Sequence, residues 1–212
     1  MKKALLFNLL VVLSVGVLAN DGKYETAMSD GLNELYSSRT IEDYQKAASK
    51  FERISAAEAD KWHPSYYACL SYLWMVSNLQ DKANMDDYLD AAQKNLDHCK
   101  NLIGEDDEII TLQGYIFMMR LVVDPPTRGA EYSPKAMQEF GKAVNMDPTN
   151  PRALLLLGQM QYGSADFFNA DTSEPCATMK QAKDMLETEE INDPLAPAWG
   201  KHMAAYLLSN CE

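Results

Sequence analysis

Cysteines and histidines are the side chains of this chain that could hold a metal, form a disulfide or act as nucleophiles. They are few, namely Cys69, Cys99, Cys176, Cys211, His63, His98 and His202. A structural zinc site uses closely spaced ligands such as a CxxC pair. No CxxC pair occurs and the three histidines are far apart in the sequence. The sequence therefore predicts no metal site.

The even number of cysteines makes disulfide bonds a reasonable expectation in an exported chain. Cys176 should begin one helix and Cys211 should close the next, which brings both to the same end of a helix pair. We predict a bond between them. Cys69 and Cys99 should also meet at one end of an antiparallel pair. For these two, a disulfide and a pair of reduced, buried side chains are both compatible with the pattern.

Motifs that carry catalysis are absent from the sequence. There is no phosphate-binding glycine loop, no GxSxG and no HExxH. The segment 158–163 (GQMQYG) lacks the middle glycine of a dinucleotide fingerprint and should lie within a helix. We expect a non-enzymatic protein without a cofactor.

Charge limits the partners that the chain can have. The net charge is −12, with acidic clusters at 86–87, 105–108 and 187–193. Phosphate-rich partners would be repelled, which argues against nucleic acids and anionic membrane surfaces. Asn169, Asp171 and Ser173 begin like a calcium loop, but Glu174 replaces the required glycine. We interpret the acidic clusters as solvated helix ends.

The N-terminus has the features of a secretory signal. Lys2 and Lys3 precede an apolar run over 4–18, and 17–19 (VLA) offers a signal-peptidase site. We predict a cleaved signal peptide over 1–19 and a single domain over 20–212, in the periplasm or secreted. A retained N-terminal anchor is the alternative, although the run is short for a bilayer of roughly 30 Å. No cysteine follows the run, which disfavours a lipoprotein, and no later segment predicts stable membrane insertion.

Apolar residues recur at spacings of three and four throughout the remaining chain, which predicts an all-α fold. We expect four helix pairs and a final capping helix. Their predicted ranges are 24–36 with 41–58, 65–78 with 85–102, 107–123 with 134–145, 151–162 with 174–187, and 196–209 alone.

A short motif is repeated four times along the chain. It consists of a small residue, a large apolar residue four positions later and a third residue three positions after that. Its copies, 44 to 46 residues apart, are Ala47/Phe51/Ile54, Ala92/Leu96/Cys99, Ala136/Phe140/Ala143 and Ala182/Leu186/Glu189. With Pro148, Leu154, Leu157 and Gly158 after the third copy, the pattern resembles the tetratricopeptide repeat (TPR) of an exported protein of Gram-negative type. The resemblance implies a solenoid of helical hairpins. It is imperfect, because Ser71 and Ala204 replace glycine, Glu189 replaces a small residue and the units exceed the usual length.

In a TPR-like fold, the first helix of each pair lines a concave face. Two rows of side chains are expected on this face, with Arg152 at one end. The residues directly after the small residue of each unit form the first row, namely Tyr72, Tyr115 and Gln159. The residues four positions after it form the second row, namely Met75, Met118 and Tyr162. Such side chains suit adaptable contacts, and an arginine can bind a carboxylate bidentately. The leading hypothesis is a scaffold that binds a peptide or a partner protein there. The alternatives are a small-molecule or glycan carrier of the cell envelope, and rows that are simply buried as core.

Two long loops are expected at 124–132 and 163–173. Phe167 and Phe168 lie in the second loop, where exposure of each ring would cost about 1.5–3 kcal/mol. We expect the two rings to be buried under the loop, the alternative being that they border a binding surface.

Overall fold

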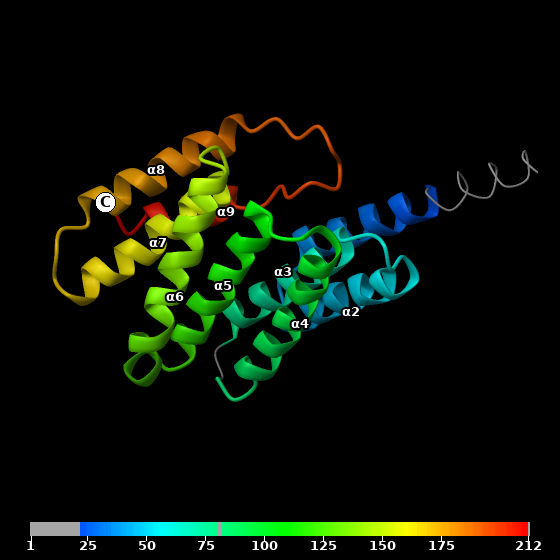
Figure 1. The fold of residues 1–212 in the computed structure, drawn as a ribbon, viewed down its shortest axis with the longest axis horizontal. Helices are drawn as coiled ribbons and strands as arrows, with labels where there is room; N and C mark the ends of the chain where they lie inside the picture. The colour runs from blue at the N-terminus through cyan, green and yellow to red at the C-terminus, as the bar shows by residue number, and fades with distance from the viewer. Residues whose placement is uncertain (1–21, 80–81, 212) are drawn as a thin grey trace, which may run out of the picture.

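The computed structural model describes residues 22–79 and 82–211, and it is built of helices and connecting segments (Figure 1). The predicted all-α class is confirmed. The first helix spans 22–37. It is followed by α2 (Ile41–Ala57), α3 (His63–Asn78), α4 (Met85–Ile103), α5 (Asp107–Val123), α6 (Pro125–Met146), α7 (Pro151–Phe167), α8 (Ser173–Thr188) and α9 (Lys201–Leu208). The expected signal peptide over 1–19 lies outside the described residues.

Local sequence signals set several helix starts. The Thr40 side chain accepts a hydrogen bond from the Asp43 backbone, and the Asp43 carboxylate accepts one from the Thr40 backbone, so α2 begins with a capping box. Asp106 caps α5, and Asn150 caps α7 by accepting two backbone N–H groups. Two of the acidic clusters thus lie in or beside first helical turns, where the helix dipole favours negative charge.

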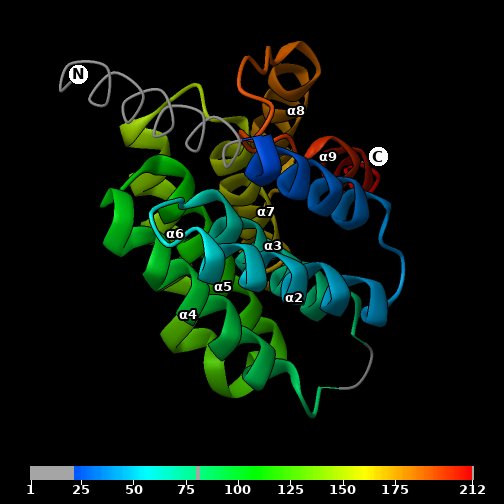
Figure 2. The same ribbon diagram turned by 90° about the vertical axis from the view of Figure 1, so that its right-hand side faces the viewer.

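Consecutive helices pack as antiparallel neighbours, and α3, α5 and α7 also contact one another in sequence order. The even-numbered helices α2, α4, α6 and α8 therefore form one layer, and α3, α5 and α7 form the other. Figure 2, turned by 90°, shows α4 and α6 on one side of the molecule and α9 on the other. We call the side of α3, α5 and α7 that faces away from the even-numbered helices the inner face.

Three of the four hairpins bring a glycine against a large side chain of the partner helix, whereas the α3–α4 hairpin has Ser71 at that position. A Cβ added at Gly114 would lie 2.6 Å from the Phe140 ring, and one at Gly31 would lie 2.7 Å from the Phe51 ring. Gly158 meets Met179 in the same way, at 2.7 Å. These contacts explain the small and large positions of the repeat, because two helices approach closely only where one lacks a side chain.

The structure differs from the predicted ranges at three places. The expected loop over 124–132 is mostly helical, because α6 begins at Pro125, where proline is tolerated in a first turn. Pro134 therefore lies inside α6 rather than at its start. The helix α7 continues to Phe167, five residues past its predicted end. The last helix begins at Lys201 instead of residue 196.

Residues 189–200, between α8 and α9, form a non-helical segment that crosses the inner face, and we call it the crossing segment. In Figure 1 it extends from the end of α8 toward the first helix and then returns to α9. Leu195 lies beside Leu32 and Tyr36 of the first helix. Leu195, Pro197 and Trp199 are buried. The segment therefore covers part of the surface that the repeat pattern predicted to be concave and open.

Candidate functional site

Most side chains of the two predicted rows are buried or already bonded. Met75 is fully buried, and Met118 is 4% exposed. Tyr72 lies away from the inner face: its hydroxyl donates to Glu52 of α2 at 3.1 Å and its ring stacks on Tyr88 of α4. The Tyr162 hydroxyl donates to the Asn210 carbonyl. The rows therefore do not form one open strip of side chains.

Tyr115 does lie on the inner face, but Trp199 covers it. The two rings stack with centroids 6.3 Å apart, and Tyr115 is 2% exposed. Burial raises the pKa of Tyr115 to about 12. The Tyr67 hydroxyl of α3 donates to the Leu195 carbonyl at 2.9 Å. The crossing segment is thus held against both α3 and α5.

Arg152 is committed to a buried ion-pair network. Its Nε donates to Glu108 at 2.6 Å, and its two terminal nitrogens donate to Glu189 at 3.0 and 2.7 Å. Burial opposes the charge of Arg152, but the two carboxylates outweigh burial and raise the pKa of the guanidinium. The bidentate partner is therefore Glu189 of this chain, and the predicted role of Arg152 as a receptor for a ligand carboxylate is corrected.

The inner face continues beyond the crossing segment. Residues seven positions apart lie two helical turns apart on the same face. Seven positions after Tyr67, Tyr115 and Arg152, all of which lie at the covered part, come Trp74, Val122 and Gln159. Val122 is 40% exposed, and Trp74 and Gln159 are partly exposed. We call these three residues the open row; Gln159 lies level with Tyr115 and Val122 lies two turns further along, because Asn150 at the start of α7 bonds to Asp107 and Glu108 at the start of α5.

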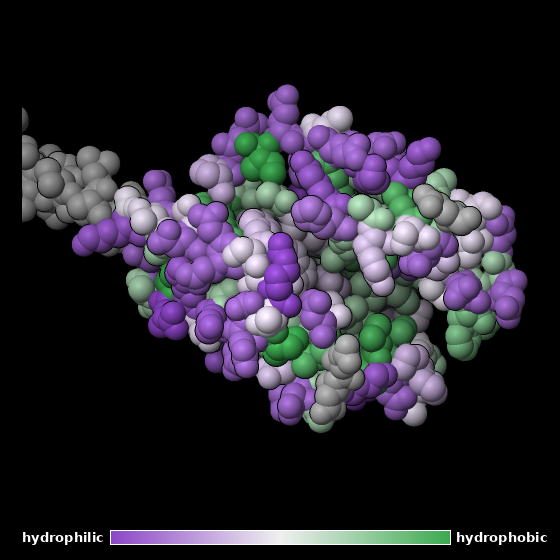
Figure 3. Space-filling model, turned by 180° about the vertical axis from the view of Figure 1, so that it is seen from behind, coloured by the Kyte–Doolittle hydropathy of each residue, from purple (hydrophilic) through white to green (hydrophobic). Residues whose placement is uncertain are grey.

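Aromatic rings surround Trp74 at this end of the inner face. Tyr36 of the first helix lies 6.0 Å from Trp74 between ring centroids, and Tyr44 of α2 meets it edge-on at 6.3 Å. Tyr36 is 36% exposed. On the side of the molecule opposite to that seen in Figure 1, the surface has a hollow with a pale to green floor and a mostly purple border (Figure 3). The surroundings of Trp74 are therefore aromatic and partly open to solvent.

Among the residues that the structure describes, none is a hydrogen-bond partner for two polar atoms of the open row. They are the Trp74 Nε1, a donor, and the Gln159 Oε1, an acceptor, and both atoms are buried. A buried polar atom left unpaired costs about 1–3 kcal/mol, so such atoms in a native protein call for an explanation. A ligand that completes their hydrogen bonds would provide one.

One cation, Arg39, lies near the aromatic rings, and a second, Lys82, lies at the end of α5. Arg39 is close enough to Tyr44 to lower its pKa, against the larger effect of burial, which raises it. The Lys82 ammonium donates to the Val122 carbonyl at the end of α5. Positive charge beside aromatic rings suits a ligand that is planar and apolar but carries carboxylates. Sequence reasoning missed Trp74, Tyr36, Tyr44, Arg39 and Lys82, because the resemblance gave only a helical register.

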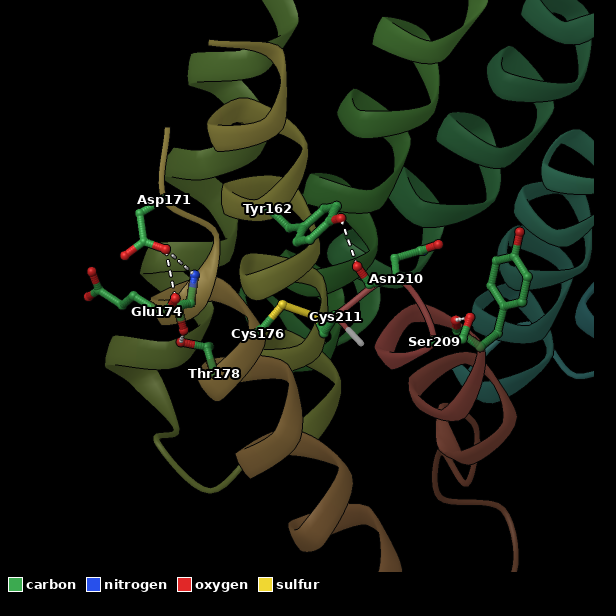
Figure 4. The surroundings of a disulfide bond; sticks show 10 residues. Tyr162, Asp171, Glu174, Cys176, Thr178, Ser209, Asn210 and Cys211 are labelled. Atoms are coloured by element: carbon green, nitrogen blue, oxygen red, sulfur yellow. Dashed lines mark hydrogen bonds between the residues drawn. A yellow bond between two sulfur atoms is a disulfide. The ribbon is translucent and has the colours of Figure 1, made fainter. Parts of the chain in front are cut away.

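The disulfide predicted between Cys176 and Cys211 is present, with Cα atoms 5.8 Å apart (Figure 4). It ties the start of α8 to the residues after α9, so the crossing segment lies within a covalently closed loop. The second candidate pair is not bonded. Cys69 and Cys99 are free, buried thiols, and burial raises the pKa of Cys99 to about 12. The reduced, buried alternative is thus the one that the structure contains.

The expectation for the aromatic pair after α7 is wrong. Phe167 and Phe168 are 77% and 73% exposed, and they pack edge-to-face on each other with centroids 5.0 Å apart. They are not buried under the loop. The reason is that α7 extends to Phe167, so the pair ends a helix and does not lie within a loop that could cover it.

Two absences hold for the described ranges, 22–79 and 82–211. No three His, Cys, Asp or Glu side chains in them are grouped so that they could hold a metal ion. Within the same ranges, each helix is too short or too polar to cross a membrane.

No protein-family model and no curated protein matches the sequence. Among solved structures, the chain is similar to the HusA haemophore from Porphyromonas gingivalis. The TM-score is 0.79 at 25% sequence identity, and the match covers 89% of this chain and 92% of the haemophore. The similarity therefore extends over nearly the whole helical fold and includes the layer that carries the open row.

Proposed function

We propose that this protein is an exported, non-enzymatic accessory protein that binds haem or a related planar tetrapyrrole at the aromatic cluster of Trp74, Tyr36 and Tyr44. The observation that carries the proposal is the similarity to a haemophore over 89% of the chain. This similarity favours the small-ligand alternative over a scaffold for peptides. The buried predicted rows and the pairing of Arg152 with Glu189 also weaken the peptide hypothesis.

The chemistry of this aromatic cluster suits such a ligand. Trp74, Tyr36 and Tyr44 offer ring faces and edges, and aromatic contacts contribute about 0.5–1.5 kcal/mol each beyond burial. The macrocycle is large, flat and apolar, whereas its two propionates are anionic. Arg39 and Lys82 are placed to attract those propionates in a protein that otherwise repels anions.

Binding at this aromatic cluster would depend on ring stacking more than on coordination of the iron. Burial raises the pKa of Tyr44, and burial likewise raises that of Tyr36, so their phenolate forms are disfavoured as iron ligands. His63 stacks on Trp62, and the imidazole of His98 bonds with Ser65. We therefore infer that iron-free protoporphyrin binds with an affinity similar to that of haemin.

Export is supported by the disulfide between Cys176 and Cys211, since such bonds persist in oxidising compartments. We place the protein in the periplasm or outside the cell. The mature form would begin near residue 20.

Absorption titrations with haemin and with iron-free protoporphyrin test the proposal. We expect both porphyrins to bind to the wild type. Trp74→Ala should raise the dissociation constant of each by about 10-fold. The double variant Arg39→Glu/Lys82→Glu should weaken the binding of both ligands but not the binding of a porphyrin whose carboxylates are esterified. Tyr206→Ala, at a 73% exposed ring of α9, is the matched control. Absence of saturable binding, or equal affinity for wild type and Trp74→Ala, would refute this assignment.

A further inference from the structure

The exposed phenylalanine pair is the strongest feature that ligand binding leaves unexplained. Phe167 and Phe168 end α7, and their backbones are fixed by hydrogen bonds from the Phe168 N–H to the Ser164 carbonyl and from the Asn169 N–H to the Asp166 carbonyl. Asn169 adopts a positive φ of 52° directly after the pair. The rings are therefore presented by an ordered turn, which we call the Phe tip.

The Phe tip is apolar with an acidic border. The exposed carboxylates of Asp166, Asp171 and Glu174 flank it in the sequence. Keeping two rings largely in water costs about 1.5–3 kcal/mol each relative to burial. A partner for this tip should therefore offer an apolar depression with positive charge at its edge.

A depression of that kind exists on this chain, between α8 and α9. It has a volume of about 550 Å³, and its apolar lining includes Ala177, Ala205, Leu208 and the disulfide. Lys180 and Lys183 contribute positive charge at its edge, and Asp184 contributes a carboxylate to the lining. Lys183 is paired with Glu187, whereas Lys180 is exposed. We call this depression the α8–α9 pocket.

The Phe tip and the α8–α9 pocket lie at the same end of the molecule. The turn between α7 and α8 and the C-terminus are adjacent in Figure 1, and Figure 4 shows Asp171 and Glu174 near the disulfide that lines the pocket. A symmetric dimer needs a patch that is complementary to itself, with each copy contributing both partners. One end that carries both a tip and a pocket meets that requirement.

We propose that the Phe tip of one copy docks into the α8–α9 pocket of a second copy, forming a two-fold symmetric dimer. Two phenylalanines bury about 150–250 Å² each when fully covered, and symmetry doubles their contribution. The sum is at the low end for a stable interface, so the dimer is weak and concentration-dependent. The dimer shares no residue with the proposed tetrapyrrole site around Trp74, so either proposal can fail without the other.

Light scattering and sedimentation equilibrium of the purified protein, from micromolar to millimolar concentrations, test this assembly. We expect a monomer–dimer equilibrium in the wild type. Phe167→Ser with Phe168→Ser should raise the dissociation constant by about 100-fold, because central aromatic contacts dominate interfaces. Lys180→Glu should raise it by about 10-fold by placing like charges opposite the acidic border. Tyr206→Ser, with a similarly exposed ring on α9, should leave it unchanged.

Each contrary result overturns the proposal. A wild type that stays monomeric throughout excludes the dimer, and a dimer that survives loss of both rings excludes the tip. If the dimer depends on the rings but its dissociation constant is unchanged by Lys180→Glu, the α8–α9 pocket is not the site that receives them. Binding of a monomer to phosphatidylcholine vesicles through Phe167 and Phe168 would assign the tip to a lipid surface instead. Circular dichroism confirms that each variant is folded.

Discussion

Trp199 donates its indole N–H to the Tyr66 hydroxyl at 2.8 Å, which joins residues 133 positions apart. Tyr66 in turn donates to Glu108 at 2.5 Å, and Glu108 accepts from Arg152. This chain of bonds connects the crossing segment to α3, α5 and α7. Because all of these groups are buried, losing one leaves its neighbours unpaired in a region without water to replace it.

The first prediction concerns Trp199. Trp199→Ala removes a side chain that is 2% exposed, together with its stack on Tyr115, and should lower the free energy of unfolding by about 3–5 kcal/mol. Trp199→Phe keeps most of the ring contact and should cost mainly the hydrogen bond, about 0.5–1.5 kcal/mol. Urea melts measure both. Tyr206→Ala should stay within about 0.5 kcal/mol of wild type. A neutral Trp199→Ala would mean that the crossing segment does not contribute to the core.

The glycine contacts of the hairpins give a second prediction. Gly114→Ala places a Cβ 2.6 Å from the Phe140 ring and should cost about 1–3 kcal/mol through overpacking. Gly141→Ala is the matched control, because a Cβ there meets nothing within 4 Å in the middle of α6. Gly141→Ala should raise the free energy of unfolding by about 0.4–1 kcal/mol, because alanine reduces the conformational entropy of the unfolded chain. Equal effects in urea melts would contradict the proposed role of the small residue in the repeat.

The parts of the fold that were predictable are those that local pattern determines. The range of α5 was predicted to the residue, because Asp106 caps its start and its apolar spacing ends at Val123. Residues 196–200 were predicted to be helical, yet they belong to the crossing segment. The partners that decide their conformation, Tyr66, Tyr67 and Tyr115, are about 80 residues or more away. No local signal reports such contacts.

The same limit applies to the candidate site. Counting from the small residue of each unit selected Tyr115, which Trp199 covers, and also Tyr72, which contacts Glu52 and Tyr88 of the even-numbered helices. It gave no indication that the chain itself would cover Tyr115. Trp74 was missed because the open row appears only once the path of the crossing segment is known.

The disulfide provides a third prediction. Denatured protein should show two free thiols without reductant and four with it, since Cys69 and Cys99 are free and Cys176 is bonded to Cys211. In the native protein, neither free thiol should react quickly, because burial raises the pKa of both. Cys176→Ser with Cys211→Ser should lower stability by about 4 kcal/mol in the chain-entropy model. Thiol titration and urea melts test these values, and four reactive thiols in unreduced protein would exclude the bond.

A fourth prediction concerns acid stability. Side-chain hydrogen bonds from Lys100 and Lys142 lower the pKa of Glu105 from its ordinary value of 4.5 to about 2. A lowered folded-state pKa adds stability that is present above the unfolded-state pKa and is lost as the pH falls through the folded-state pKa. Glu105→Gln should therefore lower the melting temperature near neutral pH, and its difference from wild type should vanish between about pH 4.5 and 2. Glu190→Gln, at an exposed position, is the control. A difference that is constant across this pH range would show that ionisation of Glu105 has no role.

The last prediction separates ligand binding from stability at Gln159. Its buried Oε1 is unpaired, so Gln159→Leu removes an unsatisfied acceptor and should leave stability unchanged or raise it by about 1 kcal/mol. Gln113→Leu is the matched control, because the amides of Gln113 and Gln93 exchange two hydrogen bonds, and their loss should cost about 1–2 kcal/mol. If the ligand pairs with the open row, Gln159→Leu should weaken porphyrin binding severalfold while Gln113→Leu does not. If Gln159→Leu lowers stability and leaves porphyrin binding unchanged, the Gln159 amide has a structural role in the core. The ligand then does not contact α7 at this position.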